Sequence, residues 1–174
     1  MGVFSNVKKQ DISGLKFADL WLSHPDVDPN TKEPRKSGKQ AHPCSENYEN
    51  QCAVRMSHAL IEWGIDFSDY PEPTCPGKGD YQGNDYARGA ESLMNYLYHK
   101  IKRYIPYQGG RTNKNLAKQA KKSLENRKGI VLFKDIGAFR GGIGDHIDIW
   151  NGKNTTSGEY FETSKKIYFI ELLK

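Results

Sequence analysis

The hydrophobic pattern of the chain changes near Gly129, from helical spacing before this residue to strand-like segments after it. Upstream, apolar side chains recur every three or four positions, which predicts helices at residues 8–24, 50–63, 86–105 and, with a more polar face, 113–127. Downstream, β-branched and aromatic residues between Gly- and Asn-rich turns predict strands at residues 130–133, 146–150 and 166–173. Helices followed by strands indicate an α+β fold with helices packed on one face of an antiparallel sheet.

Proline, glycine and asparagine mark the limits of these helices. Pro25 ends the first one, because its ring forbids the helical hydrogen bond. Gly64 suits a left-handed cap after the second helix, and Asn113 suits the N-cap of the last. Residues 26–43 and 66–85 are rich in proline, glycine and polar residues, so they are predicted to be long irregular loops.

Cys52 lies at the start of the second predicted helix. Unpaired N–H groups and the positive end of the helix dipole favour a thiolate over a thiol in a first turn. Cys52 is therefore a candidate nucleophile, provided that a base faces it. The alternative from its own neighbourhood is a small buried hydrophobic residue.

The candidate base is His146, which follows a glycine-rich turn. Alternate side chains of a strand point to the same face, so His146, Asp148 and Trp150 share one face while Ile147 and Ile149 share the other. A cysteine at a helix start that faces a histidine on a sheet is the arrangement of papain-like thiol hydrolases. The alternative is a structural histidine held by hydrogen bonds near a turn.

Length, charge and cysteine content narrow the function only a little. The 174 residues suit a single domain, 1–174, and the formal net charge of +5 suits an anionic partner or simply solubility. Cys44 and Cys75 pair in an oxidising compartment and leave Cys52 free, or all three thiols stay reduced. No apolar run approaches the ~20 residues of a membrane span, and the N-terminus shows no secretory signal. Neither membrane insertion nor Sec export is therefore expected.

The spacing of residues gives no support for a metal or phosphate site. C-x-x-C and H-x-x-x-H spacings do not occur, and residues 141–144 are not followed by the Lys-Ser/Thr of a phosphate loop. We therefore expect neither a metal nor a cofactor. The lysine-rich segment 113–128 leaves open a basic nucleic-acid-binding module, but no nucleic-acid-binding motif accompanies it, so no nucleic-acid partner is expected.

Two motifs together resemble one known family. They are Asn-Gln-Cys-Ala-Val-Arg-Met-Ser at 50–57 and Gly-Asp-His-Ile-Asp-Ile-Trp-Asn-Gly at 144–152, and a short aromatic strand follows them. This combination is similar to the fourth family of type VI secretion amidase effectors, which resembles the NlpC/P60 and papain-like thiol peptidases. The resemblance implies that fold, and a toxin that the type VI apparatus of one bacterium delivers into the periplasm of another. It also implies a cognate immunity protein in the producer.

The substrate that the resemblance implies is the peptide stem of peptidoglycan, cut at the amide between D-glutamate and meso-diaminopimelate. Cys52 is then the nucleophile and His146 the base. For the third residue, which fixes the imidazole, we expect Asp148, with Glu159 as the alternative. Family members carry an aspartate between two cysteines in the loop after the histidine strand, whereas residues 153–158 contain neither residue type.

Two alternative functions remain open at the level of sequence. A papain-like peptidase or acyltransferase acting on a protein would use the same cysteine and histidine. A basic nucleic-acid-binding module would instead use the lysine-rich segment 113–128 and would not need Cys52.

Overall fold

The computed structural model describes residues 2–36, 44, 50–101, 104–137, 139 and 141–172. Its helices are α1 (Phe17–Ser23), α2 (Cys52–Trp63), α3 (Ala90–Ile101) and α4 (Lys114–Leu124), with a short 3-10 helix at Gly79–Tyr81. Its strands are β1 (Thr74–Pro76), β2 (Asp85–Ala87), β3 (Ile105–Gln108), β4 (Gly129–Ile136), β5 (Gly144–Trp150) and β6 (Lys166–Glu171). Within the described ranges, no helix is long and apolar enough to cross a membrane.

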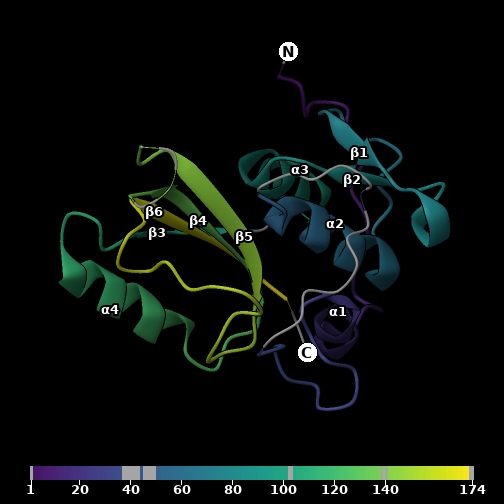
Figure 1. Cartoon of the computed structure of the whole chain (residues 1–174). Helices are drawn as coiled ribbons and strands as arrows, with labels where there is room; N and C mark the ends of the chain where they lie inside the picture. Colours follow the sequence, from purple (N-terminus) through teal and green to yellow (C-terminus); the bar gives the residue numbers. More distant parts are fainter. Residues whose placement is uncertain are drawn as a thin grey trace.

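The main sheet is antiparallel and has the strand order β3-β6-β4-β5, which makes β5 an edge strand. Figure 1 shows α2 and α3 on one side of this sheet and α4 on the other. The predicted α+β class is confirmed, but the expectation that all helices share one face is wrong for α4. The first five residues of β4 are buried on both faces, so its second face needs a helix of its own.

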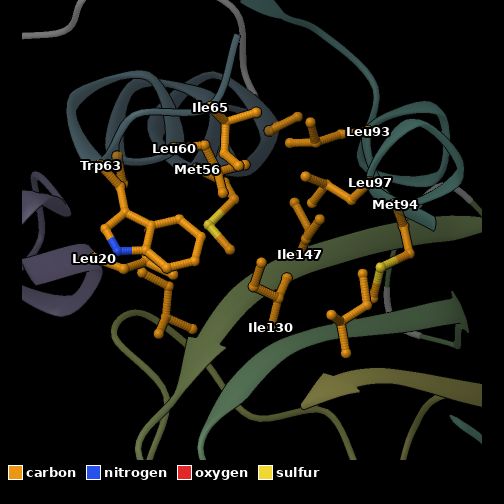
Figure 2. Close-up of a cluster of buried hydrophobic side chains, with 14 of the residues drawn as sticks. Leu20, Met56, Leu60, Trp63, Ile65, Leu93, Met94, Leu97, Ile130 and Ile147 are labelled. Atoms are coloured by element: carbon orange, nitrogen blue, oxygen red, sulfur yellow. The ribbon is translucent and has the colours of Figure 1, made fainter. Parts of the chain in front are cut away.

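The larger hydrophobic core fills the space between α1, α2 and α3 and the first face of the sheet (Figure 2). α2 and α3 each contribute a pair of fully buried residues four positions apart, Met56 with Leu60 and Leu93 with Leu97. Ile147 of β5 packs against them, on the face opposite that of His146, as the predicted alternation requires. This packing fixes α2, and with it the cysteine in its first turn.

The smaller core lies under α4 on the opposite face. α4 contributes Ala117, Ala120 and Leu124, and the strands contribute Phe133 and Trp150. The Trp150 indole N–H also donates to the carbonyl of Leu124 at 2.8 Å. Trp150 therefore ties the end of β5 to the end of α4.

Several element limits follow the sequence signals. α2 ends at Trp63, and Gly64 caps it with a left-handed φ of 113°. The side chain of Asn113 caps α4 by accepting the N–H of Asn115. α1 is shorter than predicted, because it begins only at Phe17.

The two predicted loops contain more order than their composition indicates. The segment 66–85 includes β1 and the first residue of β2, which pair antiparallel, and β2 displaces the predicted start of α3 from residue 86 to Ala90. Of the predicted loop 26–43, residues 26–36 form turns joined by a Val27–Pro34 bridge, and residues 37–43 lie outside the described residues. β3, on the edge opposite β5, is a strand that the sequence pattern does not predict.

The pairing of the cysteines agrees with one of the two alternatives that the sequence left open. Cys44 and Cys75 form a disulfide, with 5.9 Å between their Cα atoms. Cys52 is a free thiol. The disulfide joins Cys75 of β1 to Cys44, which lies eight residues before Cys52 in the sequence. Both bonded cysteines are buried beside Val54 of α2.

Candidate active site

Cys52 is the first residue of α2 and lies against the outer edge of β5. Its Sγ is 4.0 Å from the backbone oxygen of Asp145. Gln51, at the N-cap position, supplies no side-chain cap to α2. The N–H groups of the first helical turn thus receive no cap from this side chain, and that of Ala53 contacts the sulfur.

The pKa of the Cys52 thiol is lowered by its neighbours. Burial acts in the opposite direction and favours the neutral thiol, but the hydrogen bond and the positive charge of His146 outweigh it. The backbone N–H groups of Ile147 and Ala53 add further stabilisation to the thiolate. Contacts with the edge of β5, the start of α2 and the imidazole of His146 thus together favour the nucleophilic thiolate form of Cys52.

His146 projects from β5 and contacts Asp148 through one ring nitrogen. The distance from His146 Nε2 to Asp148 Oδ2 is 3.2 Å, which leaves Nδ1 as the nitrogen that can serve the thiol. The ring packs against Tyr160 at 5.0 Å and Phe133 at 6.4 Å between centroids. Although burial disfavours the imidazolium, the hydrogen bonds to Asp148 and Cys52 raise the pKa of His146 to about 10.

Asp148 is fully buried and is surrounded by hydrogen-bond donors, which we call the Asp148 cage. Its carboxylate accepts from four backbone N–H groups and two hydroxyls in addition to the ring of His146. These donors are the N–H groups of Ile149, Thr156, Ser157 and Gly158 and the hydroxyls of Thr156 and Ser157. Burial alone would raise the pKa of Asp148, but His146 and the cage lower it well below the usual range.

The loop after β5 therefore supplies hydrogen-bond donors to Asp148 and no aspartate of its own. Ser157 Oγ is 2.8 Å from Asp148 Oδ2 and 3.3 Å from His146 Nε2, so it contacts both residues. Thr156 contacts only the far oxygen, Oδ1. Neither residue was predicted from the sequence. The available signal was that residues 153–158 contain hydroxyl residues and no aspartate.

The other acidic candidates lie elsewhere. Glu159, the predicted alternative third residue, forms an ion pair with Lys121 of α4. Asp145 turns its side chain to the N–H of Asp135 at 2.9 Å, and burial raises the pKa of Asp145. Of the predicted site residues, the structure thus brings Cys52, His146 and Asp148 together and leaves Glu159 outside the group.

Two clefts meet at Cys52. The first, of about 290 Å³, is lined by His146, Ser157, Tyr160 and Phe139 and includes the Asp26–Arg55 ion pair. The second, of about 490 Å³, shares Cys52 and Asp145 with the first but extends away to Tyr70, Glu72 and the start of α3. Among the described residues, no cluster of histidine, cysteine and acidic residues is suited to hold a metal ion. Both clefts give an extended substrate access to the sulfur.

Fold and site geometry together define the class of papain-like, NlpC/P60-type hydrolases, because a cysteine begins a helix that packs on an antiparallel sheet bearing the histidine. Comparison with known proteins narrows this class. The family model of type VI secretion system (T6SS) amidase effector protein 4 (Tae4) matches residues 48–170. The chain therefore belongs to this family of amidase effectors, which are hydrolases acting on peptidoglycan.

Solved structures support the fold independently. The Tae4 effector of the Tae4–Tai4 effector–immunity system from Salmonella typhimurium has a TM-score of 0.60 at 19% identity, over 92% of this chain and 99% of that one. Tae4 from Enterobacter cloacae has a TM-score of 0.55 at 19% identity, over 72% of this chain and 74% of that one. Among curated protein sequences, none is significantly similar to this chain.

Proposed function

We propose that this effector cleaves the amide between D-glutamate and meso-diaminopimelate in the peptidoglycan stem, with Cys52, His146 and Asp148 as its catalytic residues. The observation that carries the proposal is the chain of contacts from the Cys52 sulfur through the His146 ring to the Asp148 cage, in a member of an amidase effector family. The positive net charge of +5 suits a polymer rich in carboxylates.

The proposed reaction begins with transfer of the Cys52 proton to His146. The thiolate attacks the D-glutamyl carbonyl carbon, and the N–H of Cys52 at the start of α2 stabilises the oxyanion, an interaction worth about 3–4 kcal/mol in comparable enzymes. The C–N bond then breaks as the imidazolium protonates the leaving amine of diaminopimelate. Water, deprotonated by His146, cleaves the thioester, and the proton returns to the sulfur.

Membership of the family supports a proposal for how the protein is delivered and controlled. We propose that residues 1–174 act as one amidase domain, which the type VI apparatus delivers into the periplasm of a target bacterium. The Salmonella and Enterobacter structures contain Tae4 together with Tai4 immunity proteins. A cognate immunity protein of this kind would protect the producing cell.

Digestion of purified sacculi tests the proposal. The wild-type protein should release fragments that end in D-glutamate together with fragments that carry a new diaminopimelate amine, both identified by liquid chromatography and mass spectrometry. The Cys52→Ala protein should release neither. The thiol mechanism is wrong if both proteins, or neither, produce these fragments. Modification of a protein target with intact sacculi would favour the peptidase alternative instead.

A further inference from the structure

The position of His146 assigns the two clefts to the two halves of the substrate. In acyl transfer the imidazolium donates its proton to the leaving amine, so the leaving group must lie on the side of the ring. His146 lines the first cleft and is not among the described residues that line the second. The amine half of the cleaved amide therefore occupies the first cleft, and the acyl half extends into the second.

The first cleft combines an apolar wall with a pair of opposite charges. Phe139 and Tyr160 form the wall, with 5.2 Å between their ring centroids. Arg55 lies three residues after Cys52 on α2, about one helical turn further along the same face. Its Nη1 forms an ion pair with Oδ1 of Asp26, and both groups line the cleft.

This ion pair is largely removed from solvent but has capacity for further partners. The side chains of Arg55 and Asp26 are 8% and 18% exposed. Arg55 Nη2 lies 3.4 Å from the Gln51 amide oxygen, and a guanidinium offers five N–H groups in all. A carboxylate has two oxygens, each of which accepts more than one hydrogen bond. Both charged groups can therefore bind a ligand without first separating from each other.

We propose that the Asp26–Arg55 pair recognises the zwitterionic end of the diaminopimelate side chain. Beyond the cleaved amide, this residue carries a short methylene chain that ends in one carboxylate and one ammonium group. The methylene chain fits the apolar wall, the carboxylate fits Arg55 and the ammonium fits Asp26. A stem with lysine at this position lacks the carboxylate, and amidation of diaminopimelate removes its charge. The inference rests on the proposed function, because it takes diaminopimelate as the leaving group.

The test compares kcat/KM for three stem peptides that differ only at the third residue: meso-diaminopimelate, its side-chain amide and L-lysine. The wild-type protein should cleave the first at least about tenfold faster than the other two, the effect of one charge-assisted interaction in a partly buried site. In the double variant Arg55→Gln/Asp26→Asn, which leaves no unpaired buried charge, the rate on diaminopimelate should fall and the three rates should converge.

A second ion pair in the same segment provides a matched control. Arg35 and Asp28 are 3.8 Å apart, outside the lining of the first cleft. The variant Arg35→Gln/Asp28→Asn should keep the wild-type preference. Equal wild-type rates on all three peptides, or an unchanged preference in a folded Arg55→Gln/Asp26→Asn protein, would overturn this inference but leave the amidase function intact. If the wild-type protein releases diaminopimelate from none of the peptides, both the proposed function and the inference are wrong.

Discussion

The two faces of the main sheet hold the two reactive groups by different kinds of interaction. On the face covered by α2 and α3, Cys52 is placed by a helix that apolar side chains bury. On the opposite face, His146 is placed by hydrogen bonds to Asp148, whose carboxylate is in turn fixed by the cage. The two arrangements meet at the edge strand β5.

This difference predicts different sensitivities to mutation. Apolar packing is not directional, so a core substitution costs stability before it moves the sulfur. Hydrogen bonds are directional, and a buried carboxylate that loses a donor keeps its full cost of desolvation. Catalytic activity should therefore tolerate substitutions in the core that places Cys52. It should fall when single polar atoms around His146 and Asp148 are removed.

After loss of the nucleophile itself, Asp148→Asn should have the largest effect on catalysis. It removes the charge that stabilises the imidazolium and should lower kcat/KM on stem peptides by about 10³- to 10⁴-fold. The pKa of His146, now raised to about 10, should fall, and the pKa of Cys52 should rise. The thiolate–imidazolium pair exists between these two values, so its pH window should narrow from both sides. The pH dependence of iodoacetamide alkylation of Cys52 measures both limits, and an unchanged window would contradict this assignment of Asp148.

The variants Ser157→Ala and Thr156→Val compare the roles of the two hydroxyl groups in the Asp148 cage. Each variant removes one hydroxyl donor to Asp148, but only Ser157 also contacts the His146 ring. Ser157→Ala should lower kcat by about tenfold and move the acid limb of the kcat profile upward. The Asp148 oxygen that faces the ring loses a donor, so its less offset charge raises the pKa of His146, which must be neutral to activate water. Thr156→Val should mainly reduce the melting temperature. Ser157→Thr should restore the profile; equal kinetic effects at 156 and 157 would mean that Ser157 has only a structural role.

Leu60→Ala tests the other face. Leu60 is fully buried in the core beneath α2, and its truncation should destabilise the fold by about 2–5 kcal/mol. The folded fraction should keep kcat/KM within about twofold of wild type, since the start of α2 retains its contacts with β5. Urea unfolding measures the first quantity, and active-site titration with a thiol reagent normalises the second. A large loss of activity per folded molecule would show that core packing also controls the sulfur position.

Glu159→Gln should have the smallest effect. Glu159 pairs with Lys121 at a partly exposed position, and such surface pairs contribute about 0–1 kcal/mol. Turnover of stem peptides should therefore remain at the wild-type level, with a small decrease in melting temperature. A loss of activity close to that of Asp148→Asn would instead support Glu159 as the third catalytic residue.

The sequence predicted best those features that depend on local pattern. The end of α2, its cap at Gly64 and the shared face of His146 and Asp148 all follow from periodicity and from single residues with strong conformational preferences. Each of these signals is complete within a few neighbouring positions. The class of fold followed from the order of the predicted helices and strands along the chain.

The features that the sequence did not predict depend on contacts between distant segments. β1 and β2 have three residues each, too few to show alternation, and β3 contains Pro106, which is normally a signal against a strand. The cage and the Asp26–Arg55 pair join residues that only the fold brings together, across 8–10 positions for the loop donors and 29 for the ion pair. The prediction that all helices pack on one face of the sheet is wrong for α4. The short apolar side of this helix shows that it packs on a surface, but not which face of the sheet that surface is.

The two edge strands of the main sheet, β5 and β3, differ in how readily each could pair with a strand from another molecule. Unpaired strand edges are templates for adding a strand from another molecule. At one limit, the outer edge of β5 faces Cys52 and the start of α2. At the other, β3 is only four residues long and Pro106 supplies no N–H to a new neighbour. A strand added at this edge would therefore find a short partner that lacks one donor, so the residue that obscured β3 in the sequence also makes its edge a poor template.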